Sequence, residues 1–361
     1  MPPSSWSRRQ FLARGTLGAA GLLAAPALLA ACGSSESSSD TTSAAAGGGD
    51  LGRLSVQLSW VKSNSFAGIY LADSRGYFAD QGFSSVDLLA GGPNVTPDAA
   101  IESGKALLGT ANTDTTATAI LAGADNVIVG SHFLKNPFCV MSLPDDPILE
   151  PGDLAGRKIG VSAYNTSVWE AFLTVTGVDP SAIEVVPIQF DPQPLVAGEV
   201  QGILGFVNDQ PGSLAARGVE VELMMLADFG YQLVQESVVV RRSTLESKRD
   251  LVKAFLVADV MGWRDSVADP AAGPELTATV YGKDLGITAE DLLVNSELQA
   301  GLVYPPSAAE TGIINVPDEL IEATIASIAL GGVEIEADRL FDMSVIREVY
   351  EEHPELLAPI S

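Results

Sequence analysis

Short apolar runs alternate with stretches of helical spacing along most of the chain. Residues 54–60 (LSVQLSW) alternate apolar and polar positions, as a half-buried β-strand does. Residues 66–80 carry apolar side chains at helical spacing, and Gly82 is placed to end that helix. The alternation continues, predicting strands at 86–90, 106–109 and 127–131 and helices at 97–103 and 117–122.

A second unit of the same kind begins near residue 154. It predicts strands at 159–162, 184–188 and 201–206 and helices at 168–175 and 194–198. Helical spacing then dominates, predicting helices at 249–267, 275–281, 289–302 and 317–330. Strands that alternate with helices favour parallel sheets. The pattern therefore predicts an α/β protein of two lobes, each a mostly parallel sheet flanked by helices.

The first residues have a different pattern. Residues 7–12 (SRRQFL) contain paired arginines, an uncharged apolar stretch follows over 15–31, and residues 29–32 (LAAC) place small residues before Cys32. This order is typical of a twin-arginine lipoprotein signal peptide. An uncleaved membrane helix is the alternative, but the stretch is near the lower limit for spanning and contains Pro26. We expect residues 1–31 to be the signal and Cys32 to be lipidated.

Residues 32–50 are mostly Ser, Gly, Thr and Ala, a composition that cannot bury a core and is typical of a flexible linker. The expected product is extracytoplasmic and attached to the cell membrane through the lipid on Cys32. The residues from 51 onward are numerous enough for two lobes of ordinary size.

Charge and composition exclude several classes of function. The chain has 46 acidic and 20 basic residues, a net charge of −26, which argues against nucleic acid as a partner. Cys139 is the only cysteine besides Cys32, and its apolar neighbours indicate a buried structural residue. The two histidines, His132 and His353, are far apart in sequence. With no nucleophile, Walker A or zinc-protease motif, we expect no catalytic residue, no metal and no cofactor.

Polar and aromatic residues gather where the predicted strands end. Ligands of open α/β sheets bind at the carboxyl ends of strands, in clefts with few polar groups and flat apolar faces. The candidate ligand-binding residues in these loops are Trp60, Asn64, Asn94, Asn112, Asp114, Tyr164, Asn165, Phe190, Asn208, Asp209 and Gln210. Several have simpler interpretations: Asp114 suits a helix N-cap, Trp60 could be core, and Asp209 could be only solvated.

Several motifs together resemble a known family. They are residues 57–60 (QLSW), 66–72 (FAGIYLA), 75–78 (RGYF), 101–104 (IESG), 154–161 (LAGRKIGV), 191–200 (DPQPLVAGEV), 205–211 (GFVNDQP) and 227–231 (ADFGY). The chain resembles the extracytoplasmic substrate-binding proteins of ABC importers for nitrate, sulfonates, taurine and, especially, pyrimidine precursors of thiamine. The resemblance covers nearly the whole chain after the signal, and it adds Tyr231 to the candidate ligand-binding residues.

The resemblance implies a two-lobed Venus flytrap with the type 2 periplasmic-binding-protein fold. It places lobe 1 at 51–136, lobe 2 at 137–232 and a return to lobe 1 with C-terminal helices at 233–361. The crossings are expected near 133–140 and 226–233. A tryptophan like Trp60 should stack on a heterocycle, and the loop at 208–211 should line the cleft. The implied partners are a small-molecule ligand and a membrane permease, with the protein itself a monomer.

The loops also limit the ligand. Lys62 is the only basic residue among them, so a sulfonate or nitrate would find few positive partners. A neutral or weakly basic aminopyrimidine, whose amino group donates to a carboxylate, suits them better. A sulfonate, taurine, nitrate or riboflavin-like ligand stays an alternative, as does a sensor role. A related enzymatic branch carries an active-site histidine and a cysteine cluster, and these loops contain neither.

Overall fold

A computed structural model describes residues 50–92, 94–189, 191–215 and 217–360, without the side chain of Tyr164. The predicted signal, Cys32, most of the predicted linker and Phe190 lie outside the described residues. Among the described residues, no helix is both long enough and apolar enough to cross a membrane.

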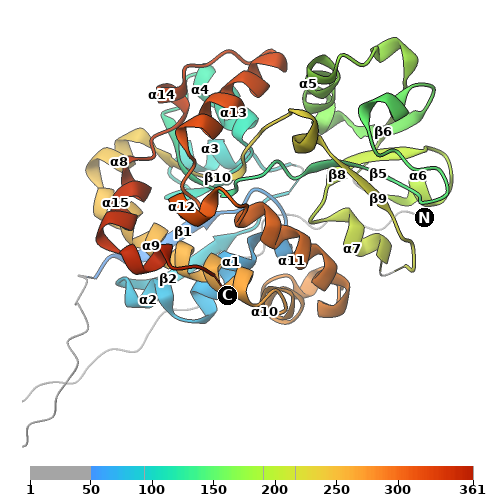
Figure 1. The fold of residues 1–361 in the computed structure, drawn as a ribbon. Coiled ribbons are helices and arrows are strands. Elements are labelled where there is room, and N and C mark those ends of the chain that lie inside the picture. Colours follow the sequence, from blue (N-terminus) through green and yellow to red (C-terminus); the bar gives the residue numbers. More distant parts are fainter. Residues whose placement is uncertain (1–49, 93, 190, 216, 361) are drawn as a thin grey trace, which may run out of the picture. The chain divides into compact units, whose positions relative to one another are not determined.

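The first sheet is built mainly from the N-terminal part of the chain (Figure 1). Its strands, in the order β2-β1-β3-β10-β4, are β2 (Phe83–Leu89), β1 (Gly52–Gln57), β3 (Leu108–Ala111), β10 (Gln235–Arg241) and β4 (Asn126–Phe133). β1 is parallel to β2 and β3, whereas β10 is antiparallel to β3 and β4.

The second sheet repeats this plan. Its strands, in the order β7-β6-β8-β5-β9, are β7 (Glu184–Ile188), β6 (Lys158–Ser162), β8 (Gly202–Phe206), β5 (Phe138–Ser142) and β9 (Glu222–Met225). β6 is parallel to β7 and β8, whereas β5 is antiparallel to β8 and β9. Each sheet is therefore mixed, and the predicted α/β class with mostly parallel sheets is confirmed with one antiparallel strand in each.

The antiparallel strands are the ones that cross between the sheets. The chain passes from β4 to β5 through residues 134–137, and from β9 to β10 through residues 226–234. A parallel neighbour needs a crossover helix, but a strand reached directly from another sheet does not. β5, β9 and β10 were not predicted from the sequence, whereas β3 and β4, which are buried throughout, were.

The helices that cover the first sheet come from two parts of the chain, one before β4 and one after β10. They are α1 (Ala67–Ser74), α2 (Tyr77–Asp80), α3 (Pro97–Glu102), α4 (Thr113–Leu121), α8 (Arg242–Ser247), α9 (Arg249–Ala268), α14 (Ala337–Leu340) and α15 (Ser344–Glu352). The helix predicted at 66–80 is broken because Gly76 adopts a left-handed φ of 79°. α9 packs closely on α1, where a Cβ on Gly262 would lie 2.1 Å from the carbonyl oxygen of Gly68.

The second sheet carries α5 (Thr166–Thr176), α6 (Gln193–Val196) and α7 (Gln210–Ala215). The remaining helices are α10 (Ala272–Leu276), a π-helix at Thr277–Tyr281, α11 (Ala289–Val303), α12 (Ala308–Thr311) and α13 (Asp318–Leu330). Two of these contact elements associated with both sheets. α11 packs against β4 and α9 but also against α7, and α13 packs against α5 and α14 (Figure 1).

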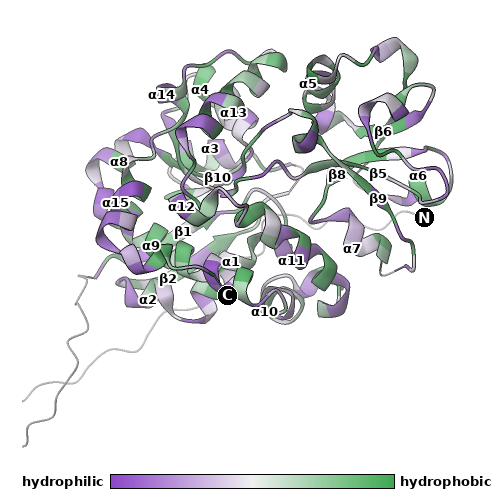
Figure 2. Cartoon of the chain, in the orientation of Figure 1, coloured by the Kyte–Doolittle hydropathy of each residue, from purple (hydrophilic) through white to green (hydrophobic). Residues whose placement is uncertain are grey.

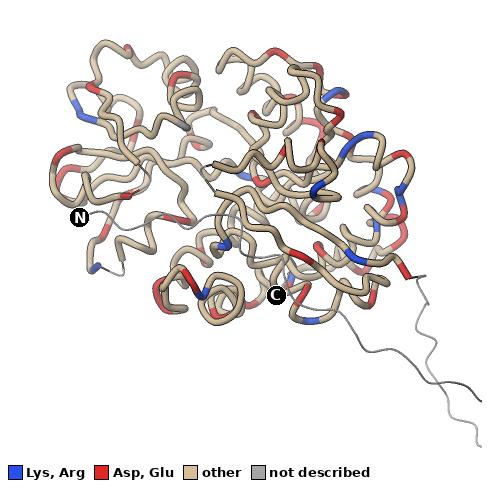
Figure 3. Tube along the Cα trace, turned by 180° about the vertical axis from the view of Figure 1, so that it is seen from behind, with Lys and Arg blue, Asp and Glu red and all other residues tan. Residues whose placement is uncertain are grey.

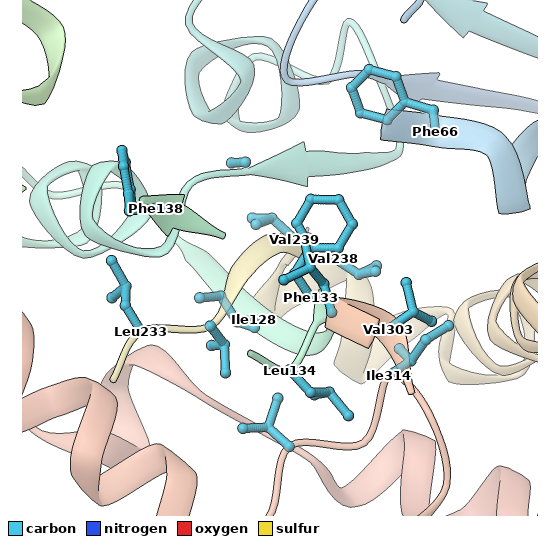
Figure 4. Packing of buried hydrophobic residues seen from close by; sticks show 14 of the residues in the cluster. Phe66, Ile128, Phe133, Leu134, Phe138, Leu233, Val238, Val239, Val303 and Ile314 are labelled. Carbon is cyan, nitrogen blue, oxygen red and sulfur yellow. The ribbon is translucent and has the colours of Figure 1, made fainter. Parts of the chain in front are cut away.

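One hydrophobic cluster extends through both crossings. Figure 4 shows Leu134 of the first crossing, Phe138 at the start of β5 and Leu233 of the second crossing together with Phe133 and Ile314, and all five are buried. Such continuous burial is the main source of folding free energy. Cys139 is free and fully buried, as predicted.

The distribution of hydrophilic and charged residues agrees with the acidic composition of the chain. Figure 2 shows hydrophilic positions along the outer helices and hydrophobic positions concentrated in the strands. Figure 3 shows acidic residues spread over many helices and loops, with basic residues scattered among them.

Candidate functional site

A cavity of about 80 Å³ lies where strand ends of both sheets meet. It is lined by Ser59, Trp60, Ser65, Pro97, Asn112, Thr115, Asn165, Gly205, Phe206, Asp209, Gln210 and Glu236. Trp60 follows β1, Asn112 follows β3, Asn165 follows β6 and Asp209 follows β8. The rule that ligands bind at the carboxyl ends of strands therefore identified these four lining residues.

Two aromatic side chains supply flat apolar surface. Trp60 is half-buried, packs partly against the hydrophobic core, and its backbone carbonyl accepts a hydrogen bond from the N–H of Gly91 at 2.8 Å. Phe206 is held edge-on against Phe138, with ring centroids 4.6 Å apart. Aromatic side chains in a cavity wall favour a planar ligand.

Two asparagines at helix starts present amides to the cavity. Asn112 is the N-cap residue of α4 and Asn165 is the N-cap residue of α5, yet neither side chain caps its helix by a hydrogen bond. Gln210, at the start of α7, accepts a hydrogen bond from the backbone N–H of Phe206 at 3.0 Å. The two asparagine amides can therefore donate to, or accept from, a ligand.

Glu236 is the most unusual residue of the cavity wall. It is 4% exposed, and its backbone has a left-handed φ of 53°, which a non-glycine residue rarely adopts. The Ser59 hydroxyl lies 2.8 Å from both carboxylate oxygens and can donate to either. Burial raises the pKa of Glu236, and the hydrogen bond from Ser59 opposes that rise. Backbone strain of this kind is concentrated at binding and catalytic sites.

Asp209 brings a second carboxylate, from the opposite sheet. Asp209 is an exposed residue, but surrounding protein atoms reduce the hydration of its carboxyl, and this desolvation raises its pKa to about 6. None of the described residues that line this cavity is basic. The cavity therefore combines two acidic groups with amides and aromatic faces, a combination that favours donors over anions.

Five of the predicted site residues line this cavity: Trp60, Asn112, Asn165, Asp209 and Gln210. Two more, Asn64 and Asn208, are buried beside it and line a neighbouring cavity. The backbone of Tyr164 lies next to Asn165, and Phe190 is outside the described residues.

The structure places the remaining three predicted residues elsewhere. Asn94 is exposed in the loop after β2. Asp114 lies in the first turn of α4, where burial raises its pKa, and it is not among the lining residues. Tyr231 is 2% exposed and packs its ring edge against Phe172 in the core.

Several residues of the cavity wall are not among the candidate ligand-binding residues, for different reasons. Ser65 and Thr115 are small polar residues of the strand-end loops that the rule picked out, but they were not chosen as candidate ligand-binding residues. Glu236 lies in β10, which was not predicted, and its approach to Ser59 joins residues far apart in sequence. No group of histidine, cysteine and carboxylate side chains among the described residues is arranged to hold a metal ion.

Two sheets of this topology, joined by two crossings with a polar cavity at their strand ends, are the two-lobed fold of periplasmic binding proteins. A solved structure with this fold is the periplasmic aliphatic sulphonate binding protein SsuA of Escherichia coli. It has a TM-score of 0.61 and 19% identity, and the match covers 77% of this chain and 91% of SsuA. At this identity the match establishes the fold and not the ligand.

The family model described as NMT1/THI5 like matches residues 63–273, more than half of the chain. The protein therefore belongs to the NMT1/THI5-like family. The riboflavin-binding protein RibY of Chloroflexus aurantiacus is 25% identical over 229 residues, 61% of this chain and 64% of RibY. A putative thiamine biosynthesis protein of Haemophilus influenzae is 24% identical over 212 residues, 57% of this chain and 66% of that protein. The matches thus span just under two thirds of each relative's length.

Proposed function

We propose that this protein is the solute-binding component of an ABC importer and that it captures a small heteroaromatic ligand similar to the pyrimidine precursors of thiamine. The observation that carries the proposal is the composition of the cavity wall. Trp60 and Phe206 are aromatic, Asp209 and Glu236 carry carboxylates, and none of the described residues in the wall is basic. A heterocycle with amino groups would stack on the indole and donate hydrogen bonds to the carboxylates.

The two sheets would act as the cores of two lobes that close on this ligand. Trp60 follows β1 and Glu236 lies in β10, both strands of the first sheet, whereas Asp209 follows β8 of the second sheet. A ligand that contacts both lobes at once favours the closed state. We propose that the crossings at 134–137 and 226–234 are the hinges and that a membrane permease receives the closed form.

The relatives support a heteroaromatic ligand more than an anionic one. The name of RibY refers to riboflavin, and that of the Haemophilus influenzae protein to thiamine biosynthesis. A sulfonate or nitrate placed between Asp209 and Glu236 would be repelled by both carboxylates once they are ionised.

Calorimetry of the purified protein tests the choice of ligand. We expect an aminopyrimidine alcohol to bind with a dissociation constant in the micromolar range or tighter, and a short alkanesulfonate not to bind at the same concentrations. Tight binding of the alkanesulfonate without binding of the aminopyrimidine would overturn the proposed ligand class.

Repeating the aminopyrimidine titration across pH provides a control on the role of Asp209. Its carboxyl has a pKa of about 6 in the free protein, so it is mostly protonated at pH 5 and mostly ionised at pH 7.5. Only the ionised form accepts hydrogen bonds at both oxygens, so affinity should rise as pH rises through 6. An Asp209→Asn variant should lose most of this rise, apart from any contribution of the ligand's own titration and of Glu236.

We also propose that residues 1–31 direct export by the twin-arginine route and that a lipid on Cys32 anchors the protein to the outside of the cell membrane. The paired arginines and the small residues before Cys32 support this. A Cys32→Ser variant should move from the membrane fraction to the soluble extracytoplasmic fraction. If wild type and variant fractionate alike, Cys32 is not the anchor.

A further inference from the structure

A second cavity, of about 320 Å³, adjoins the first. Ser65 and Asp209 line both cavities, so the two share a wall. The second cavity lies among the 3₁₀ turn Asn64–Phe66, the residues from Asn208 into α7, the π-helix and α11. Half of its lining residues carry hydroxyl or amide side chains, and the others include the aliphatic Leu285, Ile287 and Leu292.

Two amides in this wall are buried with an unsatisfied atom. Asn64 and Asn208 are each 2% exposed, and Asn64 Nδ2 and Asn208 Oδ1 have no hydrogen-bond partner among the described residues. A buried polar atom without a partner is costly, and such atoms are uncommon unless something else satisfies them.

The neighbouring hydrogen bonds fix which atom of Asn208 is unsatisfied. Asn208 Nδ2 donates to Gln299 Oε1 at 2.8 Å and to Ser65 Oγ at 3.2 Å. Gln299 Nε2 in turn donates to the backbone carbonyl of Asn64 at 3.1 Å, which orients the glutamine amide. The unsatisfied atoms are therefore one donor, on Asn64, and one acceptor, on Asn208.

A hydroxyl group matches this pair because it both donates and accepts. An anionic group matches less well, because Asp209 and Asp291 in the wall outnumber the one basic residue, Arg217. The guanidinium of Arg217 is also turned toward residues outside this cavity, donating to Gln193 Oε1 at 3.3 Å and pairing with Asp191 at 3.9 Å.

We propose that the second cavity receives a hydroxylated chain, such as a ribosyl or ribityl group, of a ligand whose heteroaromatic ring lies in the first cavity. This rests on the proposed function and narrows it from a ring to a ring with a hydroxylated tail. Ser65 and Asp209 lie where ring and tail join, and Asn64 and Asn208 hold the tail.

Matched ligand pairs test this on the wild-type protein by calorimetry. The pairs are cytosine with cytidine and lumichrome with riboflavin, and cytidine 5′-monophosphate is the anionic comparison. In whichever pair binds, the hydroxylated member should bind at least about tenfold tighter, the gain expected from one or two net hydrogen bonds. Cytidine 5′-monophosphate should bind no tighter than cytidine.

Each other result has a separate meaning. Equal affinity within a pair overturns the tail compartment and leaves the ring proposal standing. Tighter binding of the monophosphate overturns the choice of hydroxyls over an anion. Failure of every ring-bearing compound, including the aminopyrimidine, removes the proposed function and this inference with it.

An Asn64→Leu variant tests the role of the amide itself. Its preference for the hydroxylated member over the ring-only member should fall to below about threefold, because the donor for the tail is gone. Asn315→Leu is the matched control, because Asn315 is also buried with an unsatisfied Oδ1 but lines neither cavity. An unchanged preference in a folded Asn64→Leu variant contradicts the assignment, and the wild-type pairs decide the matter if that variant does not fold.

Discussion

Replacing Trp60 with alanine is expected to weaken ligand binding about a hundredfold, because the ligand loses both the apolar area of the indole and a stacking partner worth about 1 kcal/mol beyond that area. Trp60 is half-buried at the cavity wall, so the change should leave the fold intact. Calorimetry with the tightest ligand of the panel measures the effect, and circular dichroism with thermal melting checks the fold.

A Trp60→Phe variant is the control. It keeps an aromatic face of smaller area, so its loss of affinity should be clearly smaller than that of the alanine variant. Unchanged affinity in a folded Trp60→Ala protein would show that the ligand binds somewhere other than this cavity.

Asp259→Ala is expected to have the largest effect on stability, about 3–5 kcal/mol of unfolding free energy, as for other broken buried pairs. Asp259 in α9 and His132 in β4 are both fully buried, and a hydrogen bond of 2.7 Å joins His132 Nε2 and Asp259 Oδ2. The ring of His132 also packs against Trp263, with centroids 4.9 Å apart. Removing the carboxylate leaves the imidazole buried without this partner and opens a cavity. Urea unfolding measures the difference.

The double variant His132→Phe/Asp259→Leu separates the lost pair from lost packing. Replacing both partners with apolar groups of similar size should cost far less than removing one, because no polar group is then left unsatisfied. If Asp259→Ala proved as stable as wild type, the pair would have no structural role. A double variant less stable than the single one would mean that packing dominates.

The order of elements was predictable where one face of a strand is buried or a helix is amphipathic. β7 was predicted at the bounds observed, and α9 and α11 to within one residue at their C-terminal ends. Complete burial did not prevent prediction, because β3 and β4 are buried throughout and were predicted from their apolar runs. β5 and β10 were nevertheless not predicted, and β5 begins within residues 133–140, which were expected to be a crossing. Mixed rather than wholly parallel sheets follow from these same two strands.

The candidate site was predictable in part for a similar reason. Topology brings the carboxyl ends of β1, β3, β6 and β8 together, and polar residues after those strands can be read from the sequence. Glu236 could not be found in this way, because its importance depends on a left-handed backbone and on contact with Ser59. Tyr231 lies in one of the motifs that carry the family resemblance, but the motif does not show that its ring packs against Phe172, because that contact depends on the tertiary structure.

The sequence by itself determined the α/β class, the family resemblance, the export-like beginning of the chain and the acidic surface. These features depend on periodicity, composition and short motifs, which can be read from neighbouring residues without knowledge of tertiary contacts. The tertiary structure decided which loop residues share a cavity, which strands run antiparallel, and that His132 is paired with Asp259. Each of these is a contact between segments distant in sequence, and such contacts are set by how the sheets and helices pack rather than by the residues on either side.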